Sequence, residues 1–483
     1  MSGGLELLSS PPLIILSLVL VGAAGLAVLW FEDERHVRYR RWVEATARRV
    51  SRRNDLSWVD RTFLTLAAAV GFTFAVVLAW ALGNYGCTPA GPSDLATLVA
   101  SGQAFLHGGD PFSISACGRT GNPVPAGIAS VLLVALGSLG GEPGVLAVLG
   151  ITSVALIPLL WELGGPARAR STLFALVSFL YLPIVAVQVD GASLAFMPLT
   201  LLLALMLARS NWPRAALVGG FLSTGRFPSL FPWLGATGRA RGRRWLALLL
   251  SLGTFGGVSL VAYAVYRGSF LGPVLLEQLT RSHLSLSYWG ILQGEGWLQP
   301  SLASAIVQAA LLLLAVGVVF FRARREIGAV AVVLTATILL TPFLSYDELI
   351  FLLPVALVSP RARGWLWAIG LTGSVNTLLA MRSLSSLGGP NVLSYALDAI
   401  FTGLVLGLLF DLAWTELGPE DPGERGTSEG SDVGTGRGGP GKEQGRGSVE
   451  PEPPENVRSA NPPGLRRPCS FNPTGDCPPA SPR

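Results

Sequence analysis

"TFLTLAAAVGFTFAVVLAWAL", residues Thr62–Leu82, is an uncharged apolar stretch long enough to cross a bilayer as one helix. A strongly basic segment, Arg35–Arg61, precedes it, and apolar runs alternate with short arginine clusters as far as Trp414. Half of the residues (50%) are hydrophobic and only 13% are charged, whereas soluble domains carry about 25% charged residues. The sequence therefore predicts an all-α polytopic membrane protein.

The arginine clusters predict the orientation of the chain, because cytoplasmic loops are enriched in basic residues. With Arg35–Arg61 in the cytoplasm, the N-terminus lies outside and Thr62–Leu82 crosses outward. All later clusters, from Arg168 to Arg363, then fall on the cytoplasmic side. This consistency predicts about 11–13 passes through the plasma membrane, so the partner of the basic loops is the lipid bilayer and no nucleic acid is expected.

Three regions are expected. Residues 1–61 hold an anchor helix over Leu13–Trp30, which lacks the basic start and the cleavage site of a signal peptide, followed by the basic segment. Residues 62–414 form the transmembrane domain. Residues 415–483 are rich in Gly, Pro, Ser and Glu and cannot bury a core, so they are predicted to be a disordered cytoplasmic tail.

Within the transmembrane domain, Ala215–Gly235 lies between two basic clusters but is too short for two full spans. We interpret it as a re-entrant pair of half-helices with Arg226 near its tip. Ala126–Gly140 is apolar but short, and is expected to lie against the outer membrane face. Spanning helices are expected over Val145–Leu163, Ser171–Val187, Ala192–Ala208, Trp245–Tyr266, Ser301–Phe321, Ile327–Leu344, Leu349–Val358, Gly364–Met381 and Ser394–Trp414.

Ionisable residues at membrane depth are costly and commonly functional, and here they gather on the predicted outer side. Five segments contribute them, with Asp94 and Asp110, Asp190, Arg226, His283, and Tyr346, Asp347 and Glu348. Structural roles are the alternatives: an N-cap for Asp94, turns for Asp110 and Asp190, headgroup contact for Arg226 and a structural role for His283.

Two cysteines, Cys87 and Cys117, flank the predicted first external loop. In an oxidising compartment they can form a disulfide, and two free thiols are the alternative. The three histidines are scattered along the chain and no CxxC pattern occurs, so no metal site is expected.

"SDLATLVASGQAFLHGGDPF", residues Ser93–Phe112, sets Asp94 sixteen residues before the Asp110 of a Gly-Gly-Asp-Pro turn. Further along the chain come "NPVPAG", "VQVDG", "GRFPSLFPWL", "SHLSLSYWGIL" and "TPFLSYDELIFLLP". In this order the chain resembles the GT-C superfamily of membrane glycosyltransferases, above all the polyprenol-phosphate-mannose-dependent alpha-mannosyltransferases. The resemblance runs from about Thr62 to Trp414. Two departures are Phe112 in place of a tyrosine, and Glu348 and Leu349 in place of a histidine pair.

The resemblance implies a GT-C-like bundle with external catalytic loops and no cofactor. It implies inverting transfer of a hexose, mannose in that family, from a polyprenyl-phosphate donor to a glycolipid or glycan acceptor outside the cytoplasm. Asp94 would be the base that takes the proton of the acceptor hydroxyl, and Arg226 would stabilise the leaving phosphate. Substrate-binding or supporting roles would fall to Asp110, Asp190, His283, Tyr346, Asp347 and Glu348.

Two alternatives come from other functional classes. The first is a polyprenol-linked sugar flippase or another transporter, which would carry acids at mid-membrane on broken helices, with a repeat between its halves. The second is an inactive scaffold whose tail recruits partners. The clustering of acids on one predicted face favours the enzyme.

Overall fold

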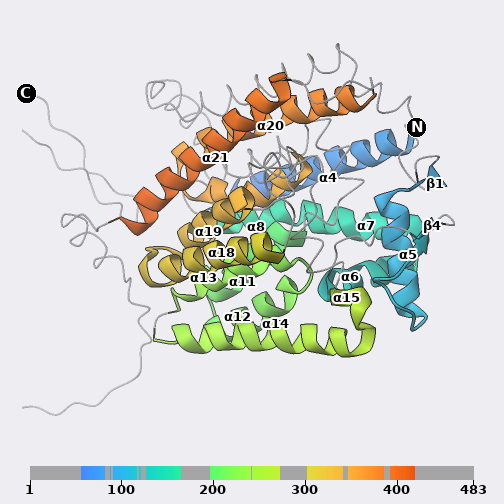
Figure 1. The fold of residues 1–483 in the computed structure, drawn as a ribbon, viewed down its shortest axis with the longest axis horizontal. Helices are drawn as coiled ribbons and strands as arrows, with labels where there is room; N and C mark the ends of the chain where they lie inside the picture. Colours follow the sequence, from blue (N-terminus) through green and yellow to red (C-terminus); the bar gives the residue numbers. More distant parts are fainter. Residues whose placement is uncertain are drawn as a thin grey trace, which may run out of the picture. The chain divides into compact units, whose positions relative to one another are not determined.

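The computed structural model describes residues 56–81, 87–88, 91–116, 119–120, 127–164, 196–240, 242–271, 302–340, 346–385 and 392–418. These residues are almost all helical (Figure 1). The exceptions include two short antiparallel strand pairs, β1 (Cys87–Thr88) with β2 (Gly91–Pro92), and β3 (Ser115–Ala116) with β4 (Arg119–Thr120). The predicted all-α class is confirmed for this part of the chain.

The first half of the described chain contains α4 (Leu56–Ala81), α5 (Asp94–Leu106), α6 (Ile128–Ser138), α7 (Gly141–Val154), α8 (Leu156–Leu163), α11 (Phe196–Ala208), α12 (Trp212–Ser223), the 3-10 turn η4 (Phe227–Ser229) and α13 (Leu230–Thr237). The second half contains α14 (Arg244–Tyr266), α15 (Gly268–Leu271), α18 (Leu302–Arg322), α19 (Glu326–Leu340), the 3-10 helix η6 (Tyr346–Leu357), α20 (Pro360–Ser385) and α21 (Val392–Leu417).

Three helical stretches among the described residues are long and apolar enough to cross a membrane. They are Gly141–Leu163, which joins α7 and α8, Arg244–Tyr266 and Ala396–Leu417. This finding is compatible with a membrane protein, whereas the number of passes and their direction stay predictions. Three expected segments lie outside the described residues: the anchor over 13–30, the whole first hairpin helix over 171–187, and most of the tail.

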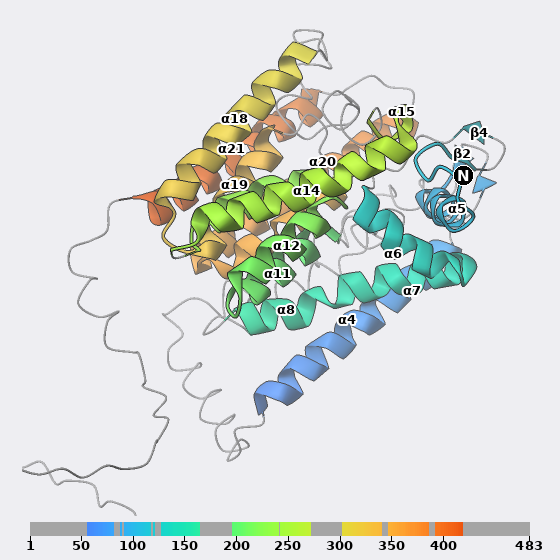
Figure 2. The ribbon, with the colours of Figure 1, turned by 90° about the horizontal axis from the view of Figure 1, so that it is seen from below.

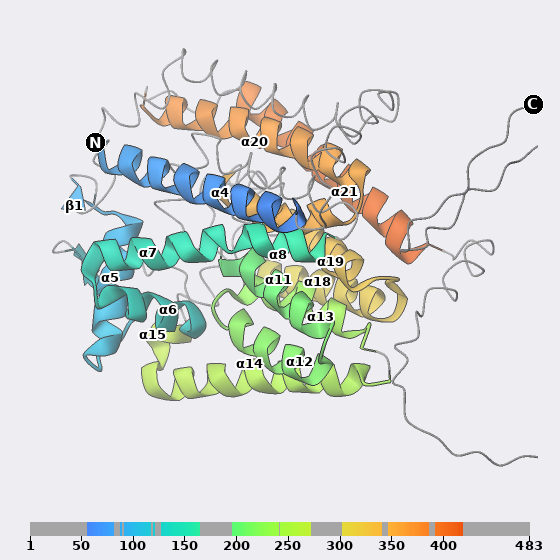
Figure 3. The ribbon, with the colours of Figure 1, turned by 180° about the vertical axis from the view of Figure 1, so that it is seen from behind.

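Helix α19 forms the centre of the core, since every residue from Gly328 to Ile338 is buried. A helix that is apolar all round must be enclosed on all sides, and α19 packs against α13, α18, α21 and η6. Peripheral helices expose apolar side chains instead, such as Phe74 and Trp80 on α4 and Leu249 on α14. Seen from behind, α4 lies along α7 and α8 (Figure 3).

Small residues bring α12 and α14 close together, as in helix packing within membranes. A Cβ atom added to Gly220 would lie 2.5 Å from the carbonyl oxygen of Ser251. The Ser251 hydroxyl accepts a hydrogen bond from the Trp233 indole (3.0 Å) and donates to the Ala216 carbonyl (3.1 Å). These bonds satisfy the buried polar atoms of Ser251 and fix α13 against α12 and α14.

The described arginine clusters lie at one end of the bundle, which we call the basic end. One cavity there is lined by Arg239, Arg243 and Arg324, and a neighbouring cavity by Arg209 and Leu357, the last residue of η6. Helices α5, α6 and α15 lie at the opposite end (Figure 2). The cluster at 168–170 lies outside the described residues.

Several expected boundaries differ from the structure; α4 begins at Leu56 rather than Thr62, and α20 spans Pro360–Ser385 rather than Gly364–Met381. Helix α21 continues to Leu417, beyond the expected end at Trp414, because Glu416 is buried (1% exposed) and pairs with Arg325 at the start of α19. The chain divides into two units after Pro419, and the second, Glu420–Arg483, lies outside the described residues. The segment expected as a pair of half-helices is the α12–η4–α13 hairpin, which begins at Trp212 and ends at Thr237.

Candidate functional site

Arg226 occupies the turn between α12 and α13. Its backbone is extended (φ −145°, ψ 103°), and the 3-10 turn η4 begins directly after it. Ser229 fixes this turn, since both its backbone N–H (2.9 Å) and its hydroxyl (2.6 Å) donate to the Arg226 carbonyl. At the other end of the hairpin, the Asn211 side chain caps α12 by accepting from the Arg214 N–H (3.1 Å). The hairpin geometry therefore follows from local capping residues.

The first turn of α6 lies directly against this turn. The backbone N–H of Gly127 donates to the carbonyl of Gly225 (2.9 Å), and the Ser130 hydroxyl donates to the same carbonyl (3.2 Å). A Cβ atom at Gly127 would lie 1.6 Å from the Thr224 carbonyl oxygen, and one at Gly225 would lie 2.1 Å from the Phe196 ring. The backbone of α6 can approach the α12–α13 turn this closely only because Gly127 has no side chain, whereas the absence of a side chain at Gly225 makes room for Phe196 of α11.

The Arg226 side chain is buried, with 7% of the residue exposed. Its guanidinium carbon lies 5.9 Å from the centre of the Phe351 ring, within the range of a cation–π interaction. Phe351 belongs to η6, which begins with Tyr346, Asp347 and Glu348. Arg226 and these three predicted site residues thus lie on elements that contact one another. A buried guanidinium is suited to a phosphate because it offers paired donors in a fixed plane.

Asp110 lies in the second turn of the site. Its Oδ1 accepts the backbone N–H of Phe112 (2.9 Å), which closes a turn through Pro111. Its Oδ2 accepts the Ser269 hydroxyl, which also lies 2.6 Å from the Tyr266 carbonyl oxygen. Oδ1 therefore closes the turn of its own loop, and Oδ2 joins this loop to Ser269 of α15.

Phe112 packs this turn onto its neighbours. It is 2% exposed, and its ring meets those of Tyr266 and Phe270 edge to face, at 5.5 and 5.2 Å between ring centres. Ile128 and Val131 of α6 belong to the same apolar cluster. The first turn of α6 thus contacts the Asp110 turn through its apolar side chains and the Arg226 turn through its backbone. The structure therefore brings the Asp110 turn and the Arg226 turn together at the start of α6.

Asp94 is the first residue of α5, and the N-cap is Ser93, whose hydroxyl oxygen accepts the Ala96 N–H (3.1 Å). The alternative interpretation of Asp94 as the N-cap is therefore wrong, because the hydroxyl of the preceding residue already holds that position. The Ser101 hydroxyl donates to the Pro111 carbonyl (2.8 Å), which ties α5 to the Asp110 turn. The structure describes the backbone of Asp94 and not its side chain.

The remaining predicted residues divide into two groups. Cys87, in β1, and Tyr346, Asp347 and Glu348, at the start of η6, have described backbones but no described side chains. Asp190, His283 and Cys117 lie outside the described residues, so the disulfide between Cys87 and Cys117 stays a prediction.

Among the buried polar residues that sequence reasoning missed, two lie within apolar helices. Asp398 is 7% exposed on α21, within an apolar stretch long enough to span a membrane. Gln308 is 1% exposed on α18, and within the described ranges neither its Oε1 nor its Nε2 has a hydrogen-bond partner. The available signal was the same for both, namely a single polar residue within an apolar helix.

Comparison of the chain with models of known protein families, with curated proteins and with solved structures finds no match. The functional proposal therefore depends on the residues and on the geometry of the two turns against α6.

Proposed function

We propose that this protein is a polytopic GT-C-like glycosyltransferase of the plasma membrane. In this proposal it transfers a hexose, with mannose the sugar favoured by the resemblance, from a polyprenyl-phosphate donor to a glycolipid or glycan acceptor on the extracytoplasmic face. The observation that carries the proposal is the buried Arg226 in the turn between two short helices, next to the element that begins with Tyr346, Asp347 and Glu348.

The orientation in the membrane follows from the basic end, because arginine-rich ends of membrane helices favour the cytoplasm. Helices α5, α6 and α15, with the Asp110 turn, then face the outside. Helix α12 has 12 residues, which amounts to about 18 Å of rise and about half of a bilayer's hydrocarbon thickness. Arg226 is thereby expected within the membrane thickness, below the outer surface, where a buried guanidinium must be paired with an anion or with a polar cavity.

The proposed reaction is a displacement at the anomeric carbon of the donor sugar. The acceptor hydroxyl oxygen forms the new bond to that carbon, and the bond from the carbon to the phosphate oxygen breaks with inversion. The hydroxyl proton passes to the carboxylate of Asp94, which acts as general base. Polyprenyl phosphate leaves with the bonding electron pair, and the guanidinium of Arg226 stabilises the charge that it gains.

Positioning roles fall to the other residues of the site. Asp110 uses both carboxylate oxygens in hydrogen bonds to Phe112 and Ser269, which supports a role in holding the α5 loop rather than in the chemistry. Tyr346, Asp347 and Glu348 are proposed to bind sugar hydroxyls.

The test is sugar transfer in membranes that contain the full chain, with labelled polyprenyl-phosphate mannose as donor. Asp94→Asn is expected to lower the transfer rate by about 100-fold or more, the usual contribution of a general base. Asp411→Asn, at a partly exposed position of α21, is the matched control and should leave the rate unchanged. Undiminished transfer by Asp94→Asn would remove the proposed base.

A transporter of lipid-linked sugars is the second candidate, and one observation favours it. The α12–η4–α13 hairpin is a broken helix with a buried charge at its tip, which is the kind of element that transporters use at their substrate sites. Labelled donor supplied on the outer side distinguishes the two. An enzyme gives a glycosylated product, and a transporter only moves the lipid to the other leaflet.

A further inference from the structure

A second site lies at the basic end, far from the residues used above. It is a cavity of about 750 Å³ between the end of α13, the start of α14 and the turn that joins α18 to α19. Among the described residues, its lining contains five arginines, Arg239, Arg243, Arg244, Arg324 and Arg325, and a single acid, Glu326. The cavity therefore favours an anion.

The five arginines differ in their partners. Arg325 pairs with Glu416, and an Nη2 of Arg324 donates to the Gly418 carbonyl (2.9 Å). By contrast, Arg239, Arg243 and Arg244 form no ion pair within the part of the chain that the structure describes. The Nε of Arg239 is buried without a hydrogen-bond partner in that same part. Unpaired guanidinium groups around a cavity are suited to bind phosphate oxygens.

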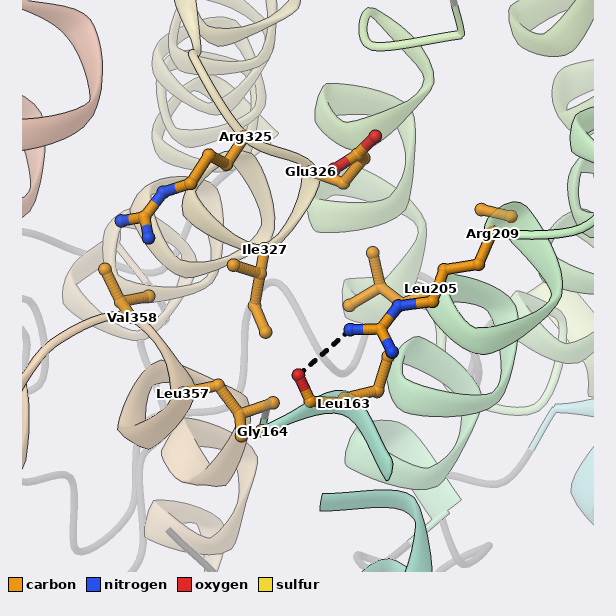
Figure 4. Close-up of a pocket in the computed structure, with 10 residues that line it drawn as sticks. Leu163, Gly164, Leu205, Arg209, Arg325, Glu326, Ile327, Leu357 and Val358 are labelled. Carbon is orange, nitrogen blue, oxygen red and sulfur yellow. Dashed lines mark hydrogen bonds between the residues drawn. The ribbon is translucent and has the colours of Figure 1, made fainter. Parts of the chain in front are cut away.

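A neighbouring cavity of about 480 Å³ shows the opposite situation (Figure 4). Its Arg209 donates to the carbonyls of Glu162 (2.9 Å) and Leu163 (3.0 Å) and so closes the C-terminal end of α8. Its other arginine is Arg325, which is paired with Glu416. Because Arg209 already donates to two backbone carbonyls and Arg325 is paired with Glu416, this cavity offers fewer free guanidinium donors to an anion, and the larger cavity is the better site.

The larger cavity opens beside an apolar surface. Trp245 and Leu249 of α14 are 53% and 66% exposed, and Phe321 of α18 is 56% exposed. The guanidinium of Arg244 lies over the rings of Trp245 (5.8 Å) and Phe321 (5.6 Å). Arg244 thus lies at the boundary between the charged cavity and the apolar faces of α14 and α18, which is the arrangement expected at a lipid headgroup.

The start of α14 adds backbone donors to the site. No described side chain forms a capping hydrogen bond to this helix at Arg243, and the preceding Gly242 has a positive φ of 67°, which glycine adopts without strain. The first N–H groups of a helix have no partner within the helix and attract anions. They begin at the cavity that the unpaired arginines line.

We propose that this cavity binds the phosphate headgroup of an anionic phospholipid, with the acyl chains lying along the exposed faces of α14 and α18. Basic cavities between membrane helices on the cytoplasmic side are suited to such headgroups. The proposal rests on the basic cavity and its apolar surroundings, and it is independent of the glycosyltransferase activity.

The experiment uses the full chain in detergent–phosphatidylcholine micelles and titrates phosphatidylglycerol with brominated acyl chains, which quench nearby tryptophan fluorescence. Quenching by phosphatidylglycerol is expected to exceed quenching by brominated phosphatidylcholine at equal mole fraction. The excess should be lost in Trp245→Phe. The triple variant Arg239→Gln/Arg243→Gln/Arg244→Gln should weaken the affinity for phosphatidylglycerol by about tenfold or more.

A matched triple variant, Arg214→Gln/Arg322→Gln/Arg361→Gln, removes the same charge from exposed arginines that do not line the cavity and should stay within about twofold of wild type. Equal weakening by both triple variants would overturn the proposal, since it would indicate nonspecific charge attraction. The triple Arg→Lys variant keeps the charge and gives a second measurement if the Gln variant does not fold. It is expected to bind several times more weakly than wild type, because lysine cannot form paired hydrogen bonds.

Competition separates a lipid from a soluble phosphate. Glycerol 3-phosphate and inorganic phosphate are each added at the concentration at which phosphatidylglycerol saturates the site. The proposal expects neither to displace the lipid. Full displacement by either would overturn the lipid assignment and identify a soluble phosphate compound as the occupant.

Discussion

The backbone N–H of Gly127 donates to the carbonyl of Gly225 at 2.9 Å, and this bond joins the start of α6 to the turn that carries Arg226. The same turn of α6 contacts Phe112 beside Asp110 through Ile128 and Val131. Two loops that are far apart in sequence therefore share one support, and their relative position depends on α6.

Gly127→Ala is predicted to separate α6 from the Arg226 turn, because the added Cβ would lie 1.6 Å from the backbone oxygen of Thr224. We expect a loss of about 2–3 kcal/mol in the free energy of unfolding, as for other overpacked sites. Thermal unfolding in detergent measures it. Gly253→Ala is the control, since a Cβ there meets nothing within 4 Å. Equal stability of the two variants would contradict the close contact.

Substitutions of Arg226 are predicted to affect transfer in a graded way. Arg226→Lys keeps the charge but loses the planar pair of donors, and should reduce kcat by about tenfold. Arg226→Gln removes the charge, and should reduce kcat by about 100-fold or more. Arg214→Gln, at the exposed start of α12, serves as the control. Equal activity of the Lys and Gln variants would show that charge at this turn does not matter.

The Asp110–Ser269 hydrogen bond is predicted to contribute to the free energy of unfolding. This contribution should appear as a coupling energy between the two residues. A double-mutant cycle with Asp110→Ala and Ser269→Ala should give a coupling energy of about 1.5–3 kcal/mol, the range for hydrogen bonds to charged groups. Asp110→Asn should cost less than Asp110→Ala, since an amide oxygen can still accept the Phe112 N–H. Strict additivity of the two alanine substitutions would mean that the bond contributes nothing to stability.

In the Arg325–Glu416 ion pair one partner is buried and the other is exposed, and this difference predicts the effect of substituting Arg325. Glu416 is 1% exposed in its side chain and Arg325 is 52% exposed, so Arg325→Gln leaves a buried charge unpaired. We expect this variant to lose about 3 kcal/mol or more of unfolding free energy. Arg325→Gln/Glu416→Gln should recover part of the loss. The control is Arg322→Gln in the exposed last turn of α18. A double variant as unstable as Arg325→Gln would contradict this account.

The helices were predictable because apolar runs bounded by arginines determine them locally. Trp245–Tyr266 was expected and α14 spans Arg244–Tyr266, and Arg226 lies in the expected turn between two short helices. Both predictions follow from composition and length, which a single sequence contains.

The contacts between elements were not predictable in this way. The Ser130–Gly225 bond joins residues 95 positions apart, and no local pattern signals it. The burial of Glu416 was missed because the sequence around it resembles a polar tail, and only the opposing Arg325 explains why α21 continues. The cap of α5 by Ser93 rather than Asp94 was a choice between two adjacent residues that both favour the position.

The 3-10 geometry of η6 also sets the distance between its first and last residues. Its 12 residues rise about 24 Å as a 3-10 helix, whereas the same residues would rise about 18 Å as an α-helix. With three residues per turn, positions 348, 351, 354 and 357 form one straight row. The distance from Glu348 to the ring beneath Arg226 is therefore fixed by helical pitch. A return to α-helical pitch would draw the start of η6 toward its other end by about 6 Å, about the width of one sugar ring.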